Sequence, residues 1–207
     1  MTPAPPPLRY LALGDSYTIG EAVAADARWP ALLVQNLRQA GVIIGDPRIV
    51  AVTGWTTDEL AQGMAEAELA PPHDLVTLQI GVNNQYRGRP ADEYHTQFTT
   101  LLQQAIQLGG NRPGRVVVVS IPDWGVTRFA REQGRDPAQI AVALDHFNRI
   151  AADEAGRTGA HFVDITGISR AHPGLVADDG LHPSAAQYAL WVRAIEPLVS
   201  QVLRSRS

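Results

Sequence analysis

The chain has 207 residues, of which 45% are hydrophobic and 18% are charged, and its net charge is −4 at pH 7. This is the composition of an ordinary globular domain. The acidic balance argues against nucleic acid as the main partner, because phosphate binding rests on clustered Lys and Arg. The chain contains no cysteine, which excludes disulfides, thiolate metal sites and cysteine nucleophiles.

The beginning of the chain carries several prolines and lacks the apolar core of a secretory signal. No stretch of the sequence reaches the length of a membrane span. We therefore expect a cytoplasmic protein with a flexible tail over residues 1–8 and a single domain over residues 9–207.

The first half of the chain contains three predicted strands and two predicted helices. In chain order these are a strand at 9–14, a helix at 29–40, a strand at 48–52, a helix from 56 to about 69 and a strand at 75–80. The first helix stops before Gly41, a residue type that favours a helix C-terminus. The second begins with Thr56 and Glu59, which have the Thr-x-x-Glu spacing of a capping box.

The second half continues the alternation. Its predicted elements are a helix at 91–108, a strand at 116–120, a helix from 136 to about 156, a strand at 160–164 and a helix from 184 to about 203. The run of Val at 116–119 indicates a strand buried on both faces. Asp136 and Pro137 are favoured at the N-cap and first position of a helix. The segment through Trp124 and Phe129 is expected to be a loop.

Strictly alternating strands and helices predict an α/β fold. The strands should form a five-stranded parallel sheet, with helices on both faces and right-handed crossovers. This is a three-layer arrangement, for which we expect a flavodoxin-like strand order.

Polar residues follow the predicted strands at the points where ligands bind in open α/β sheets, outside the carboxyl ends. The segments are GDSY at 14–17, TGW at 53–55, GVNN at 81–84 and, before the last helix, DDGLHPS at 178–184. Groups with catalytic potential thus collect at one edge of the sheet.

The residue types at this edge suit acyl transfer. A serine hydroxyl such as that of Ser16 needs a neighbouring base, and the base needs a group that orients it. His182 can be the base, and Asp179 lies three residues before it across a turn that contains Gly180. Metal-binding and phosphate-binding motifs are absent from the sequence, so we expect no metal and no cofactor.

The oxyanion that forms during acyl transfer needs preorganised hydrogen-bond donors. The backbone N–H groups of Ser16 and Gly54 and the side-chain amide of Asn83 can supply three. Gly54 has no side chain to block the approach of the substrate oxygen.

These four segments together resemble the SGNH (GDSL-type) hydrolases. The blocks are LALGDSYTIG with Ser16, AVTGWTT with Gly54, GVNNQYRG with Asn83 and DDGLHPS with Asp179 and His182. The resemblance covers nearly the whole chain. It implies a three-layer α/β/α fold, esterase, lipase, thioesterase or carbohydrate deacetylase activity, and no cofactor.

Two positions depart from common serine-hydrolase patterns. Asn84 stands where the third block of the family often has Asp, which puts in question the support of Asn83. Thr18 stands two positions after Ser16 in place of the glycine of the Gly-x-Ser-x-Gly elbow, which disfavours the α/β-hydrolase class.

Other residues compete for roles at the site. His172 also precedes a proline but lacks an acid three residues before it, and Asp178 lies one residue too far from His182. Asp15 is interpreted as a structural residue of its turn. The loop residues expected to shape the substrate pocket, with ordinary loop packing as the alternative, are Tyr86, Arg87, Trp124 and Phe129.

The sequence therefore predicts a serine esterase that forms an acyl-enzyme. We expect its substrates to be small molecules, namely small or short-chain acyl esters. An acyltransferase, a carbohydrate deacetylase and a thioesterase remain open on the same site, as does a non-catalytic flavodoxin-like binding domain. The acyl length, the natural alcohol and the oligomeric state are left open.

Overall fold

A computed structural model of the chain describes residues 5–204. Its centre is a parallel five-stranded sheet with the order β2-β1-β3-β4-β5, the expected flavodoxin-like order. Each strand begins and ends within one residue of its expected bounds. The strands are β1 Tyr10–Gly14, β2 Arg48–Ala51, β3 Leu75–Gln79, β4 Val116–Val119 and β5 His161–Val163.

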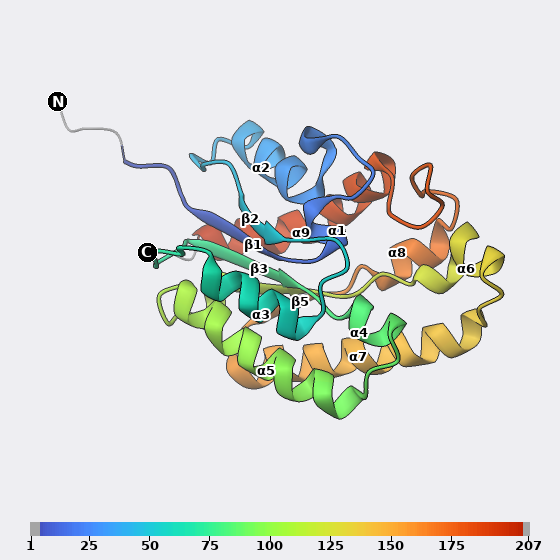
Figure 1. Ribbon diagram of the computed structural model, residues 1–207. Helices are drawn as coiled ribbons and strands as arrows, with labels where there is room; N and C mark the ends of the chain where they lie inside the picture. Colours follow the sequence, from blue (N-terminus) through green and yellow to red (C-terminus); the bar gives the residue numbers. More distant parts are fainter. Residues whose placement is uncertain (1–4, 205–207) are drawn as a thin grey trace.

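Helices cover both faces of this sheet, so the predicted three-layer α/β fold is confirmed (Figure 1). One face carries α2 (Trp29–Gln39) and α9 (Ala185–Arg204). The opposite face carries α3 (Thr57–Glu66), α5 (Ala91–Leu108) and α7 (Pro137–Thr158). The chain passes from β1 through α2 to β2 at one edge of the sheet, and then turns back through β3 and β4 to β5 at the other edge. Because of this reversal, α2 lies on a different face from α3, α5 and α7.

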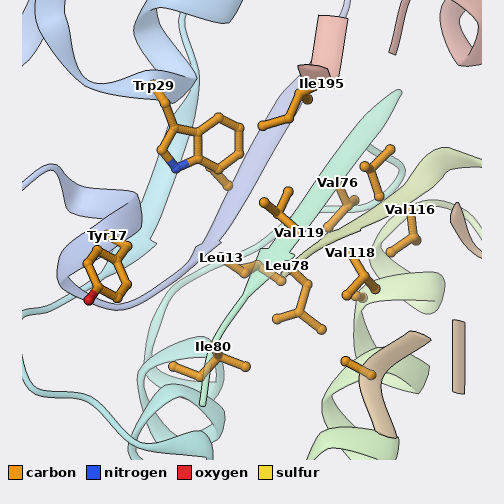
Figure 2. Close-up of a cluster of buried hydrophobic side chains, with 14 of the residues drawn as sticks. Leu13, Tyr17, Trp29, Val76, Leu78, Ile80, Val116, Val118, Val119 and Ile195 are labelled. Carbon is orange, nitrogen blue, oxygen red and sulfur yellow. The ribbon is translucent and has the colours of Figure 1, made fainter. Parts of the chain in front are cut away.

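The core lies between these layers. All four Val residues of β4 are at most 2% exposed, as expected for a strand covered on both faces. Figure 2 shows Trp29 of α2 and Ile195 of α9 on the same side of the strands, and both side chains are fully buried. Burial of these large side chains anchors both helices to the sheet whose edge carries the polar segments.

The long helices begin where the sequence predicts. The Thr56 N–H donates to the Glu59 carboxylate over 2.8 Å, which completes the expected capping box of α3. The Asp136 carboxylate accepts a hydrogen bond from the Ala138 N–H at the start of α7. At its other end α3 stops at Glu66, earlier than expected.

Several short helical segments were not expected from the sequence. They are α1 (Ser16–Ile19), α4 (Val82–Tyr86), α6 (Arg128–Glu132), α8 (Thr166–Ala171), and the 3₁₀ turns Ala25–Ala27, Pro113–Arg115 and Trp124–Val126. The expected loop through Trp124 and Phe129 is therefore wrong, because it contains a 3₁₀ turn and α6. One or two helical turns carry too little hydrophobic periodicity to be read from sequence, and tertiary contacts stabilise them.

The expected tail over residues 1–8 lies partly outside the described residues, because residues 1–4 are not described. In the described part, the Leu8 N–H donates to the Ile43 carbonyl and the Gly45 N–H donates to the Leu8 carbonyl, both over 2.9 Å. Leu8 is therefore bonded to the segment that precedes β2. Within residues 5–204, no helix combines the length and the apolar character that a bilayer crossing requires.

The end of β1 tests how tightly this edge is packed. A Cβ atom at Gly14 would lie 2.6 Å from the Gln79 carbonyl oxygen and would also clash with the Thr18 side chain. We expect Gly14→Ala to lower the free energy of unfolding by roughly 1–3 kcal/mol, as overpacking does. Urea unfolding measures this change.

Gly156 provides the matched control. A Cβ there meets no atom within 4 Å, and the residue lies inside α7. Gly156→Ala should therefore raise the free energy of unfolding by about 0.5–1 kcal/mol. A Gly14→Ala variant as stable as the parent would contradict the packing described.

Candidate active site

Three strand ends meet at one edge of the sheet. Gly14 at the end of β1 is the register partner of Ala51 in β2 and of Gln79 in β3. The segments that follow these strands therefore start side by side, and α1 and α4 lie at the same end of the sheet in Figure 1. The boundary between β1 and β3 is also the point where the strand order reverses, which is the usual binding crevice of such folds.

Ser16 is the first residue of α1 and is 5% exposed. The Asp15 side chain caps this helix by accepting a hydrogen bond from the Tyr17 N–H over 3.0 Å. Gly20 ends the helix in a left-handed conformation, and its N–H donates to the Ser16 carbonyl. Ser16 is thus held on a single helical turn directly after a buried strand.

Asp179 and His182 form a local pair. The Asp179 Oδ2 atom lies 2.6 Å from Nδ1 of His182, and Oδ1 accepts hydrogen bonds from the N–H groups of Leu181 and His182. Burial raises the pKa of Asp179, but these N–H groups and the imidazole outweigh it and hold the pKa below its usual value. An ionised carboxylate at Nδ1 favours a proton on that nitrogen and leaves Nε2 as an acceptor.

Ser16 and His182 line the same pocket, which has a volume of about 200 Å³. His182 also makes an edge contact with the Tyr17 ring, with 5.9 Å between ring centroids. Among the described residues, no hydrogen bond of 3.5 Å or less joins Ser16 to His182. Such bonds are often loose without substrate and tighten when it binds.

Gly54 lies in the turn at residues 52–55, which the Trp55 N–H closes by donating to the Val52 carbonyl. Gly54 is the third residue of this turn and has φ 88°, as in a type II turn, where glycine is favoured. The closing bond does not use the Gly54 N–H, and no acceptor among the described residues is bonded to it. The Gly54 N–H is therefore free to bind an oxyanion.

Asn83 lies in the first turn of α4 and lines the pocket beside Gly54. Its Nδ2 atom donates to the Trp55 carbonyl over 2.9 Å. A side-chain amide has two N–H donors, so the second is left for a ligand.

Asn84, the position at which the family often has Asp, is fully buried. Its Nδ2 donates to the Thr57 Oγ1 atom over 2.7 Å, and its Oδ1 accepts from the Thr57 N–H over 3.1 Å. The amide thereby ties α4 to the start of α3 with one donor and one acceptor. Asn83 is thus supported despite the departure at the next position.

The expected aromatic residues Tyr86, Trp124 and Phe129 all line the pocket. The Tyr86 and Trp124 rings meet edge to face with 5.3 Å between centroids, and the Phe129 ring lies 6.4 Å from each. The Trp124 Nε1–H donates to the Gln85 side chain over 2.8 Å, which fixes the indole. The three rings form an aromatic wall on one side of the pocket.

Arg87 is placed differently from the expectation, because it is not among the residues that line the pocket. Its Nη2 atom donates to the Gly54 carbonyl over 2.7 Å, and Nη1 lies 3.4 Å from the Glu59 carboxylate. These contacts turn its guanidinium towards the turn at 52–55 and towards α3.

Four further residues that line the pocket were not expected from the sequence. They are Tyr17, Thr53, Val82 and Leu181. Each of them is next in the sequence to an expected site residue, and this adjacency was the one sign in the sequence that they lie at the site. The rivals His172 and Asp178 do not line this pocket. Within residues 5–204, no cluster of three or more His, Asp or Glu side chains is arranged to hold a metal ion.

Comparison with known proteins agrees with the geometry. The model of the GDSL-like lipase/acylhydrolase family matches residues 12–190. An arylesterase of Vibrio mimicus is 28% identical over 185 residues, which cover 84% of this chain and 80% of that protein.

Solved structures share the fold. A lipase/acylhydrolase from Enterococcus faecalis has a TM-score of 0.74 at 18% identity, with coverage of 94% of this chain and 96% of that one. Axe2, an acetylxylan esterase from Geobacillus stearothermophilus, has a TM-score of 0.73 at 21% identity, with coverage of 97% and 98%.

The buried Asp15 predicts a pH dependence of stability. Burial raises the pKa of Asp15 from 3.8 to about 7, although the Tyr17 N–H lowers it in part. The folded state therefore binds more protons than the unfolded state between these two values. The contribution of Asp15 to stability is greatest below the unfolded pKa and is lost as the pH rises to about 7, by up to about 1.4 kcal/mol per pH unit.

Asp15→Asn keeps the acceptor for the Tyr17 N–H but cannot ionise. We expect its free energy of unfolding, measured with urea at pH 5 and pH 8, to fall less with pH than that of the parent. Asp136→Asn, at the exposed N-cap of α7, is the matched control and should keep the parental slope. An unchanged slope in Asp15→Asn would show that Asp15 is ionised in the folded protein at both pH values.

Proposed function

The chain belongs to the GDSL-like lipase/acylhydrolase family and is a carboxylic ester hydrolase, and from this premise we propose that Ser16, His182 and Asp179 form its catalytic triad. The observation that carries the proposal is the hydrogen bond between Asp179 and His182 at the pocket that Ser16 also lines. A nucleophile, a base and an orienting acid are the groups that acyl transfer requires.

In the acylation step, the Ser16 hydroxyl oxygen attacks the ester carbonyl carbon and His182 Nε2 accepts the hydroxyl proton. Asp179 stabilises the imidazolium that forms, and its lowered pKa keeps it ionised for this role. His182 then donates the proton to the departing alcohol. A water molecule, deprotonated by His182, then attacks the acyl carbon. His182 returns this proton to the Ser16 oxygen as the carboxylic acid leaves.

The tetrahedral intermediates carry a negative oxygen. We assign its binding to the N–H groups of Ser16 and Gly54 and to the second N–H of the Asn83 amide. Two observations support this assignment: the Gly54 N–H has no partner among the described residues, and Asn83 is anchored by its bond to Trp55. Donors held in place before the reaction stabilise the oxyanion without reorganisation.

The pocket favours small substrates. Its volume of about 200 Å³ is below the range of roughly 300–1,000 Å³ typical of sites for drug-sized ligands. Its wall of Tyr86, Trp124 and Phe129 suits an apolar acyl or aryl group. We propose small or short-chain acyl esters as substrates, in keeping with the similarity to an arylesterase.

Hydrolysis of p-nitrophenyl acetate by site variants tests the mechanism. We expect Ser16→Ala to lose turnover by at least about 10³-fold. Asn83→Ala should lose about 10² to 10³-fold in kcat with little change in KM, because it acts mainly on the intermediate. Thr96→Ala is the control, since within residues 5–204 this exposed hydroxyl bonds only to the Asp92 carbonyl of its own helix.

Each variant has a result that would contradict the role proposed for its residue. Turnover that survives in Ser16→Ala would remove Ser16 from the mechanism. Full turnover in Asn83→Ala would remove that amide from the oxyanion hole.

Acyl length tests the substrate class. In a series of p-nitrophenyl esters from acetyl to palmitoyl, we expect kcat/KM to be highest between acetyl and butyryl, because longer chains exceed the pocket. A maximum at the longest chains would contradict the proposed class. Added alcohols provide a further readout, since transfer of the acyl group to alcohol in preference to water would identify an acyltransferase.

A further inference from the structure

We propose that Arg87 is a positioning residue of the oxyanion hole, which holds the turn at residues 52–55 so that the Gly54 N–H faces the pocket. The inference rests on the proposed function, because it assigns a role to Arg87 only through the oxyanion donor. Arg87 is not among the pocket-lining residues and therefore acts through Gly54.

The Gly54 N–H belongs to the central peptide of the turn, whose direction depends on the backbone angles of Thr53 and Gly54. Glycine restricts these angles less than any other residue, so this peptide needs to be held from outside. On one side, the Thr53 hydroxyl donates to the Glu21 carboxylate. The Glu21 N–H in turn donates to the Ser16 carbonyl over 3.0 Å. The turn is thereby connected to the segment of the nucleophile.

The opposite side of the turn is held by α4 and the residue that follows it. Arg87 Nη2 donates to the Gly54 carbonyl over 2.7 Å, and Asn83 Nδ2 donates to the neighbouring Trp55 carbonyl over 2.9 Å. The bond from Arg87 has a charged donor, and such bonds are about twice as strong as neutral ones. The Thr53–Gly54 peptide, which carries the Gly54 N–H, is therefore held from both sides: through the Thr53 side chain on one side and through Arg87 on the other.

Arg87 also lies against Gly54 itself. Arg87 Nη2 lies 3.8 Å from the place that a Cβ atom of Gly54 would occupy, so the guanidinium packs directly against the turn. The second contact of Arg87, with Glu59, is a surface ion pair between side chains that are 43% and 40% exposed. Exposed pairs of this kind contribute little to stability. The bond to the Gly54 carbonyl is therefore the distinctive contact of Arg87.

The test compares Arg87→Ala with Arg87→Lys and Arg89→Ala on p-nitrophenyl acetate. We expect Arg87→Ala to lower kcat by about 10-fold to 100-fold with KM within about twofold of the parent, as misplacement of a catalytic group does. Arg87→Lys should recover part of kcat, because an ammonium group can donate one bond to the carbonyl. Guanidinium ions added well below denaturing concentrations should raise kcat of Arg87→Ala and leave the parent unchanged.

Arg89→Ala is the matched control. Arg89 carries the same charge two residues later and pairs with Asp58 of α3, so its removal also breaks a contact with that helix. Among the described residues, the Arg89 side chain donates to Asp58 and Glu93 and to no backbone carbonyl of the turn. We expect Arg89→Ala to keep the parental kcat and KM.

Three results would overturn the inference. The first is a parental kcat in Arg87→Ala, and the second is a raised KM with unchanged kcat, which would assign Arg87 to substrate binding. The third is an equal loss of kcat in Arg89→Ala, which would indicate general loosening. If Arg87→Ala does not fold, Arg87→Lys replaces it as the test. A lower kcat with an unchanged KM then supports the inference, and a parental kcat or a raised KM overturns it. Activity that survives in Ser16→Ala would instead refute the proposed function itself, so the two failures are distinguishable.

Discussion

Parallel strands end at the same edge of a sheet, and β2, β1 and β3 end here in register, with Gly14 opposite both Ala51 and Gln79. This alignment depends on strands that are buried between two layers of helices. A shift of one strand by a single residue would turn its buried side chains to the other face. The same alignment places the chain segments of Ser16, Gly54 and Asn83 next to one another, although they are distant in the sequence. Core packing and the geometry of the candidate site therefore have one cause.

The site combines groups of two kinds. Asp179 and His182 meet through a short local turn, and the Asp179 carboxylate is fixed by backbone N–H groups within the same segment. The proposed oxyanion donors depend on contacts between segments, since Asn83, Asn84 and Arg87 join α4 and its end to the residues after β2. The proposed acid and base are thus held by local structure, whereas the proposed oxyanion donors are held by tertiary structure. In our account, substitutions in α4 and at its end should affect the oxyanion more than the proton transfer.

The sequence predicted the strands and the long helices well, because hydrophobic periodicity and capping residues such as Thr56 and Asp136 carry that information locally. It missed the short helices at the sheet edge, since a single turn such as α1 has no readable period. At the site, strand-end motifs pointed to residues that the structure brings to one pocket. The position of Arg87 was not predictable, because a long side chain that follows a short helix can turn either to the pocket or to a neighbouring turn. Its contact with the Gly54 carbonyl depends on how Asn84 and Thr57 join α4 to the start of α3, which no local pattern encodes.

In the proposed mechanism, Ser16 forms a covalent acyl-enzyme. The most direct measurement is mass spectrometry of the protein after reaction with diethyl p-nitrophenyl phosphate, which transfers its diethylphosphoryl group to an activated serine oxygen and releases p-nitrophenolate. The proposed mechanism predicts one adduct per chain, on the peptide that contains Ser16, with esterase activity lost in proportion to labelling. It also predicts much slower labelling when His182 is replaced by Ala. An adduct on another residue that accompanies the loss of activity, or full activity in protein labelled at Ser16, would contradict it.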